Sequence, residues 1–378
     1  MSRFSTSFLS TTLILLVPTA LGGCGTAKTT DETGDSNIGI DDTGGNETGE
    51  EDTDSGDSGE NDSGDNDTAQ PPAGDLDRCV LASRELAEDW VWTGDNVAGT
   101  FDHLDYKDGV LAAIQGVDEL VVLDLPKNGG EPSVSGRQSA FEEWHDLYLT
   151  EWGEVVAAGN WTVGFWQLSN DGFGYTRWPT NSVPLASVAP SPDGARITGP
   201  DYTASFVPGE NGVPIVSGLD EPMVVGGDAT RAWIAGLLDG QQAVAVGFDG
   251  DAEAYRTPVP IRGVMGNPTG ILALSDGALV IGGPDGYGWL ARLDENGAVT
   301  NTLQFESPGL NRVAGSAGSA FAWTFFTGMG VFAADLDTLF YTWATPGEDI
   351  VDLVVDPDGS WLVTSHSDGS LRRWVCPA

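Results

Sequence analysis

Short apolar runs that follow tight turns recur along most of the chain. Each run spans six residues, as in "VLAAIQ" from Val110, and the next run starts 37 to 46 residues later. The seven runs begin at Val110, Val155, Ala195, Ala232, Ala278, Ala320 and Ser360. This period is typical of four-stranded propeller blades, and seven starts in about 300 residues predict a seven-bladed ring.

Turn residues support the same interpretation. "KDG" precedes the run at Val110, "LSDG" precedes the run at Ala278 and "DPDG" precedes the run at Ser360. Asp-Gly pairs favour hairpins because both residues adopt positive φ readily. Only "VLASRELAEDW", from Val80, fits a short helix. The sequence therefore predicts an all-β domain over residues 79–378.

The ring should be closed by a strand from the N-terminal side of the domain. The last repeat stops at "SLRRWVCPA", which corresponds to a third strand. "DWVWTGDN" is similar to "FYTWATPGED", which fits the outer strand of another blade. We expect Trp90–Thr93 to complete the last blade beside Leu371–Val375. This closure brings Cys79 and Cys376 to the same side, where they form a disulfide in an oxidising compartment or remain two free thiols.

The last repeat, "LVVDPDGSWLVTSHSDGSLRRWV", resembles a WD-repeat blade, and "VAPSPDGARI" resembles related repeats with a Ser-Pro-Asp-Gly turn. Asp368 and Trp374 take the positions of that family's turn aspartate and end-of-strand tryptophan. The family's Gly-His pair and Trp-Asp dipeptide are absent from the sequence. The resemblance implies the propeller fold and carries little information about function.

The N-terminus has the features of an export signal. Its apolar stretch, Phe8–Leu21, is shorter and more polar than a bilayer-spanning helix. The tetrad Leu21-Gly22-Gly23-Cys24 resembles the lipobox of bacterial lipoproteins. The resemblance implies that residues 1–23 are removed and that Cys24 carries acyl chains, which would anchor the protein to a membrane. The alternative is an ordinary signal peptide beside an unmodified cysteine.

The residue after Cys24 bears on localisation. Lipoprotein sorting in Gram-negative bacteria uses an aspartate at this place for inner-membrane retention, and this chain has Gly25. The resemblance therefore favours the outer membrane and leaves the exposed face open.

Residues 24–78 form a separate acidic region. From Gly25 to Arg78 there are 17 acidic residues and two basic ones, with no aromatic residue. Such a segment buries too little apolar surface to offset its ordering entropy, so we expect a disordered tether. "DTDSGDSGENDS" begins like a calcium loop but places Gly56 where the third ligand belongs. Whether calcium binds there stays open, although a solvated spacer fits better.

Charge narrows the classes of partner. The formal net charge is −41, and both the tether and the domain are acidic. Phosphate binding requires a basic face, so a nucleic acid is an unsuitable partner. A protein or peptide is compatible with this surface, and we expect a monomer.

Few residues in the domain suggest catalysis or metal binding. His103, His145 and His366 lie in different repeats without metal-ligand spacing, so we predict no metal and no cofactor. The most unusual local cluster is "FEEWHDLYLTEW". Its candidate binding residues, for a metal or a basic peptide, are Glu142, Glu143, Trp144, His145 and Asp146. The alternative is a polar connector that enters an inner strand.

Two functional classes fit these features. The first is a membrane-anchored, non-enzymatic scaffold that binds a protein or ligand in the cell envelope. The second is a propeller hydrolase or lyase, similar to lactonases or glycosidases, with a metal or carboxylates at the central channel. The second class requires several His, Glu or Asp residues at equivalent inner-strand starts in successive blades. The sequence reveals no such set, so we favour the scaffold.

Overall fold

The computed structural model describes the chain from residue 75 to residue 377 with gaps. The described residues are 75–82, 84–94, 99–116, 118–126, 130–139, 142–150, 153–169, 172–179, 185–192, 194–199, 202–207, 212–215, 217–228, 230–260, 267–283, 288–305, 310–315, 319–324, 328–333, 336, 339–344 and 349–377. The predictions for Cys24 and for the signal peptide lie outside these residues, as does nearly all of the predicted tether.

The described strands form seven four-stranded sheets, which we number as blades along the chain. Strands pair in sequence order in blades 1 to 6. Blades 1 to 3 consist of β2 (Phe101–Lys107), β3 (Val110–Gln115), β4 (Glu119–Asp124) and β5 (Ser133–Ser139); β6 (Trp144–Leu149), β7 (Glu154–Gly159), β8 (Thr162–Ser169) and β9 (Gly172–Pro179); and β10 (Ser187–Ser191), β11 (Gly194–Gly199), β12 (Tyr202–Phe206) and β13 (Val213–Pro214).

Blades 4 to 6 have the same antiparallel order. They consist of β14 (Glu221–Gly227), β15 (Ala232–Leu238), β16 (Gln242–Asp249) and β17 (Ala252–Pro258); β18 (Pro268–Leu274), β19 (Gly277–Gly282), β20 (Gly288–Asp294) and β21 (Val299–Phe305); and β22 (Leu310–Gly315), β23 (Ser319–Thr324), β24 (Gly328–Ala333) and β25 (Leu339–Ala344).

Blade 7 joins the two ends of the domain. β26 (Ile350–Val355), β27 (Trp361–His366) and β28 (Leu371–Val375) follow in order, and β1 (Ala87–Trp92) adds the outer strand beside β28. Trp90 pairs with Arg373 in this register. The outer strand from the N-terminal side is as predicted, but it begins three residues earlier than Trp90.

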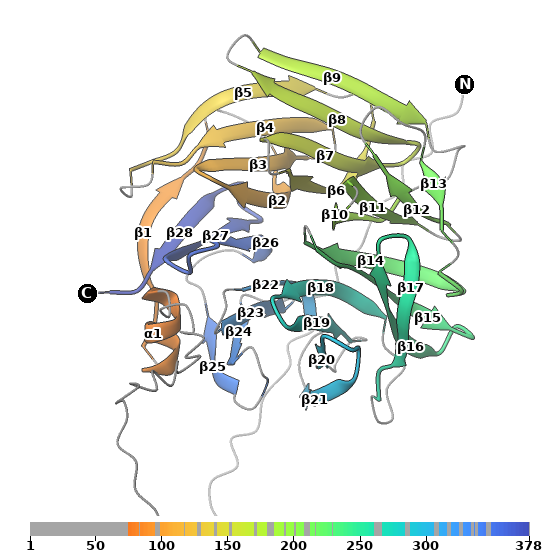
Figure 1. The fold of residues 1–378 in the computed structure, drawn as a ribbon. Coiled ribbons are helices and arrows are strands. Elements are labelled where there is room, and N and C mark those ends of the chain that lie inside the picture. The colour runs from red at the N-terminus through yellow and green to blue at the C-terminus, as the bar shows by residue number, and fades with distance from the viewer. Residues whose placement is uncertain are drawn as a thin grey trace, which may run out of the picture. The chain divides into compact units, whose positions relative to one another are not determined.

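The inner strands define a closed propeller. Each first strand, from β2 to β26, contacts the first strand of the next blade, and β26 contacts β2. Figure 1 shows β2, β6, β10, β14, β18, β22 and β26 around the middle, with strands such as β5 and β9 farther out. The prediction of an all-β propeller is confirmed. Because successive blades are built alike and follow one another along the chain, the apolar runs recur with one period.

Hairpin chemistry sets the strand ends. Asp108 and Gly109 connect β2 to β3 with φ values of 50° and 90°, and Asp239 and Gly240 connect β15 to β16 with 53° and 61°. Positive φ at both central residues gives the twist that adjacent antiparallel strands require. The Asp108-Gly109 pair therefore forms the turn that "KDG" predicts, and Asp239-Gly240 forms a second turn of the same kind.

The apolar core lies between neighbouring blades. One cluster joins Ile114 of blade 1 to Trp144 and Trp166 of blade 2, whose rings meet edge to face at 5.0 Å. Gly164 makes this packing feasible, because a Cβ there would lie 2.5 Å from the Trp144 ring. Other buried tryptophans also lie between neighbouring blades, namely Trp233, Trp289, Trp361 and Trp374, whereas Trp161 is exposed.

The helix differs from its prediction. α1 spans Asp75–Leu81, and the later part of "VLASRELAEDW" enters β1 instead. Leu76, Cys79 and Val80 are fully buried at helical spacing against blades 6 and 7. Tertiary packing of this face places the helix earlier than local propensity suggests. Among the described residues, no helix has the length and apolar character needed to cross a membrane.

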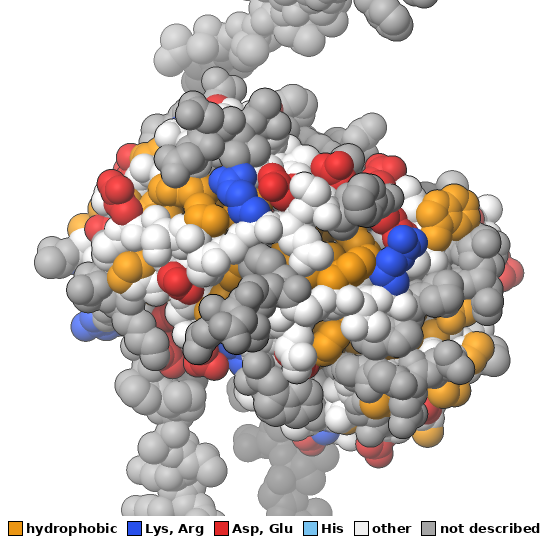
Figure 2. Space-filling view, turned by 90° about the horizontal axis from the view of Figure 1, so that it is seen from above, with side chains coloured by type: hydrophobic (Ala, Val, Ile, Leu, Met, Phe, Trp, Pro, Cys, Tyr) orange, Lys and Arg blue, Asp and Glu red, His pale blue; other side chains and the backbone are white. Residues whose placement is uncertain are grey.

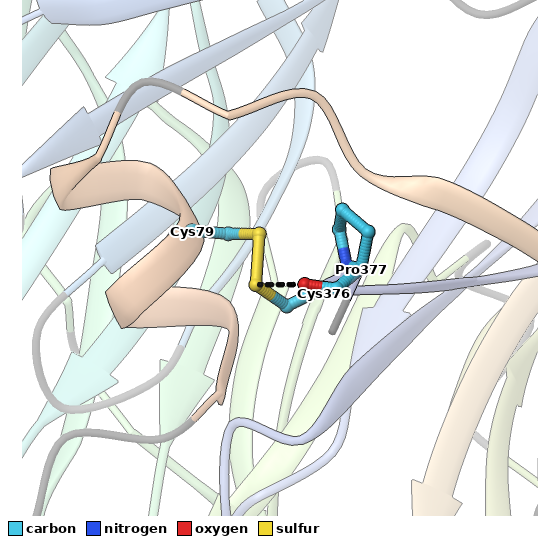
Figure 3. Close-up of a disulfide and its surroundings, with 3 residues drawn as sticks. All are labelled: Cys79, Cys376 and Pro377. Carbon is cyan, nitrogen blue, oxygen red and sulfur yellow. Dashed lines mark hydrogen bonds between the residues drawn. A yellow bond between two sulfur atoms is a disulfide. The ribbon is translucent and has the colours of Figure 1, made fainter.

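The structure contains the predicted disulfide. Cys79 of α1 is bonded to Cys376, which follows β28, with a Cα–Cα distance of 5.6 Å (Figure 3). The two residues are separated by 297 positions. The bond therefore ties α1 to the blade in which the two ends of the domain meet.

Candidate functional site

Ionisable side chains occupy equivalent inner-strand positions in four consecutive blades. In blades 6, 7, 1 and 2, the register shifts near the start of the inner strand, and pairing resumes at Arg312, Asp352, His103 and Asp146 respectively. The expectation that no such set exists is therefore wrong. In blades 4 and 5, the matching residues are Val224 and Gly270, so the charged set covers one part of the ring interior.

Arg312 joins this set across the ring. Its guanidinium group lies 3.4 Å from Asp146 Oδ1 and 3.6 Å from Asp352 Oδ1. It also contacts Nδ1 of His103. Because Arg312 and Asp146 belong to blades 6 and 2, the side chain reaches past the inner strands of two intervening blades. These four residues form the central cluster.

The carboxylates of the central cluster also connect neighbouring blades. Asp352 Oδ2 accepts a 2.8 Å hydrogen bond from the backbone N–H of Leu104 in blade 1. Asp146 Oδ2 accepts a 3.0 Å bond from the N–H of Val188 in blade 3 and a 2.7 Å bond from the Ser187 hydroxyl. Both aspartates are buried. Each carboxylate thus satisfies a backbone N–H on the inner strand of the next blade, which is an edge strand of its sheet.

Asp105 makes a third connection of this kind. Its Oδ2 accepts a 2.6 Å bond from the N–H of Leu149 in blade 2, and its Oδ1 accepts a 2.9 Å bond from the N–H of Tyr106. Burial raises the pKa of Asp105 to about 7, although both N–H groups oppose the shift. The nearby negative charge of Asp146 raises this pKa further. Ionised Asp105 is therefore an unfavourable group in the folded protein.

The central cluster fixes the protonation of His103. Burial lowers its pKa well below the usual value, and the positive charge of Arg312 lowers it further. Guanidinium nitrogens only donate hydrogen bonds, so Nδ1 of His103 accepts and the ring proton is on Nε2. His103 is therefore neutral, and its Nε2–H is a hydrogen-bond donor.

Arg312 and Asp352 influence each other in opposite directions. Burial raises the pKa of Asp352 to about 6, and the Arg312 charge restrains that rise. Burial alone would lower the pKa of Arg312, but Asp352 and Asp146 raise it overall. The guanidinium group therefore stays charged and occupies the space between the two carboxylates. Among the described residues, no group of three or more His, Cys, Asp or Glu side chains is arranged to hold a metal ion.

The sequence-predicted cluster at residues 142–146 divides between different roles. Asp146 joins the central cluster, whereas Trp144 is in the core. Glu142 is buried and accepts hydrogen bonds from Trp161 N–H and the Thr162 hydroxyl. The segment is therefore the polar connector of the alternative interpretation, and Asp146 is the residue of this segment that reaches the ring interior.

The other two members of this cluster hold the β7–β8 turn. Glu143 Oε2 accepts a 2.9 Å bond from the Asn160 amide nitrogen. His145 Nε2 lies 2.8 Å from Asn160 Oδ1, which identifies it as the donor because a carbonyl oxygen only accepts. Both residues thus contact the same asparagine from the start of blade 2.

His366 is part of a buried network in blade 7. Trp374 Nε1 donates a 2.8 Å hydrogen bond to the Thr364 hydroxyl, which lies 2.8 Å from His366 Nε2. All three side chains are buried. Asp368 is in the following turn, where its carboxylate accepts the Ser370 N–H at 2.8 Å. This network links strands β27 and β28 and has no reacting group at the surface.

Sequence reasoning did not identify Arg312, Asp352 or His103 as one site. They are separated by up to 249 positions in the chain, and their common feature is the residue at which pairing resumes after a register shift. An alignment of the repeats on their inner strands, rather than on the more apolar second strands, would bring them together. No protein-family profile matches this sequence, and no curated protein sequence matches it either.

Proposed function

We propose that the protein is a lipid-anchored protein of the bacterial cell envelope whose propeller is a non-enzymatic scaffold for a protein or peptide partner. The lipobox-like tetrad ending at Cys24 supports the anchor, and the acidic composition of residues 25–78 supports a flexible tether. The propeller fold supports the scaffold, because its strand connections expose variable loops on both faces of a rigid ring. We place the protein at the outer membrane, on either face, and as a monomer.

The interactions of the central carboxylates are the observation that favours a scaffold over an enzyme. A propeller hydrolase needs carboxylates or a metal that can reach a substrate. Asp146 and Asp352 instead accept backbone N–H groups of the next blade and face the Arg312 guanidinium group. These contacts link blades 6, 7, 1, 2 and 3 to one another. Acidic, basic and apolar side chains are interspersed on the side of the molecule in Figure 2, which suits a protein-facing surface.

The lipid anchor can be tested separately from the scaffold. Cells that express the full chain should incorporate radioactive palmitate into the protein, and Cys24→Ala should abolish the label because it removes the acylated thiol. Cys376→Ser is the matched cysteine control and should retain the label. Label that persists in Cys24→Ala would refute the anchor and leave the scaffold proposal intact.

An enzyme is the second candidate, and one observation favours it. His103 is neutral and shares the Arg312 guanidinium group with Asp352, whose pKa is raised by burial to about 6, and perturbed pKa values of this kind gather at catalytic sites. The candidate reaction would be hydrolysis or elimination on a lactone or glycoside. Turnover of an aryl glycoside or a lactone that is lost in both His103→Ala and Asp352→Asn would favour the enzyme over the scaffold.

A further inference from the structure

Trp161 is exposed at the turn between β7 and β8. Its exposed fraction is 53%, whereas Trp144 and Trp166 of the same blade are almost fully buried. Of the tryptophans whose side chains the structure describes, only Trp161 falls in the exposed class. An exposed tryptophan offers a large apolar face to a partner, and tryptophan is enriched among the residues that dominate protein interfaces.

The turn that carries Trp161 is fixed by the segment before β6. Glu142 Oε1 accepts the Trp161 N–H at 2.6 Å, and the Glu143 carbonyl accepts the Asn160 N–H at 3.1 Å. The side chains of Glu143 and His145 hold the Asn160 amide from two directions. The backbone beneath the exposed ring therefore has a defined conformation, which reduces the ordering entropy that a partner would have to overcome.

The charge around the turn favours a cation. Glu143 is exposed, and its carboxylate accepts the side-chain amide of Asn160, the residue directly before Trp161. Arg177 is the nearby basic side chain, and it faces the buried Glu142 at 3.4 Å. The tryptophan face attracts guanidinium and ammonium groups, and an adjacent carboxylate adds an ion pair. The acidic domain as a whole attracts the same class of ligand.

We infer that Trp161 and Glu143 form a docking surface for an arginine- or lysine-containing segment of a protein partner. This inference rests on the proposed scaffold function and specifies its partner class. The basic side chain stacks on the Trp161 ring while its charge pairs with Glu143. The carboxylate of Glu142 and the imidazole of His145 act through the turn and do not touch the partner.

The test is fluorescence anisotropy with labelled peptides and the full chain in detergent at 0.15 M salt. The probe is an octapeptide of alternating arginine and glycine, and the comparison peptide has glutamate in place of arginine. Trp161→Ala should weaken binding of the basic peptide at least about fivefold, and Glu143→Gln about two- to fivefold. Trp161→Phe should retain part of the affinity. The acidic peptide should not bind.

Two control variants separate this surface from general attraction to an acidic chain. Val213→Ala removes another exposed apolar side chain, and Glu295→Gln removes an exposed carboxylate from the β20–β21 turn of blade 5. Both should bind the basic peptide like the wild type. The acidic segment before residue 79 is present in every variant, so its contribution cancels in the comparison.

Each outcome has a distinct meaning. Equal affinity in Trp161→Ala and wild type would overturn the docking surface, and so would the absence of any binding of the basic peptide. Binding of the acidic peptide that depends on Trp161 would overturn the partner class. None of these results would overturn the scaffold itself, which another surface could still provide.

Discussion

At the residue scale, buried carboxylates have two effects on this protein. Asp105, Asp146 and Asp352 each satisfy a backbone N–H of the next blade, which stabilises three consecutive junctions. Burial makes their charge unfavourable, and only Asp146 and Asp352 have the Arg312 guanidinium group beside them. Asp105 has no such ion pair among the described residues. It should therefore respond most directly to pH.

The pH dependence of stability has a definite sign at Asp105. Its pKa is about 7 in the folded protein and near 3.9 in the unfolded chain, so the folded state binds more protons between these values. The unfolding free energy should therefore fall as the pH rises from about 4 through 7. Asp105→Asn should flatten this slope, so that the variant loses less stability than the wild type between pH 5.5 and 8.5.

Urea denaturation at several pH values measures this slope. Glu295→Gln, which changes an exposed carboxylate, is the control and should keep the wild-type slope. Parallel curves for Asp105→Asn and wild type would contradict the assignment of the proton to Asp105.

At the element scale, the strands were predictable and the helix was not. The apolar runs and Asp-Gly turns repeat with the blade, so local chemistry and global fold agree. α1 instead depends on Leu76, Cys79 and Val80 packing against blades 6 and 7, a contact that no local pattern encodes. The outer strand of blade 7 was found because it resembles another outer strand, although β1 extends further than that likeness suggested.

The disulfide belongs to this scale because it fastens α1 to blade 7. Replacing Cys79 and Cys376 by serine should lower the unfolding free energy by roughly 4 to 5 kcal/mol under the chain-entropy model for so long a loop. The reason is that the unfolded chain gains freedom when the cross-link is removed. Thermal unfolding of the double variant and of reduced wild type should give the same lowered transition.

Cys24→Ala serves as the control for this measurement, since it leaves the bond between α1 and blade 7 intact. An unchanged transition in the double variant would mean that the bridge adds nothing to stability. An intact mass that does not rise on reduction would mean that the bridge is not formed in the isolated protein.

At the scale of the whole molecule, the chain combines a proposed anchor signal, an acidic segment and a closed propeller. The propeller could be predicted from the period of one strand per blade, but the central cluster could not. Its members become neighbours only when the ring closes, and the register shifts displace them from a simple count along each repeat. Sequence reasoning noticed the segment at residues 142–146 because its composition is unusual, yet only Asp146 reaches the interior.

The scaffold proposal assigns ligand binding and the central cluster to different parts of the propeller, whereas an enzyme would bind its substrate at the central cluster. In this proposal, partner binding takes place at the exposed β7–β8 turn, and the central cluster holds the blades together. Changes at Trp161 should therefore affect binding with little effect on stability. Changes at His103 should leave the partner surface intact, because His103 touches Arg312 rather than the turn.

Photo-cross-linking in living cells tests this claim most directly. A photoreactive amino acid at position 161 of the chain should give one discrete cross-linked product, with an arginine or lysine beside the attached residue of the partner. The same product should form when His103→Ala is added. Absence of a discrete product, or its loss in His103→Ala, would contradict a scaffold that binds through the β7–β8 turn.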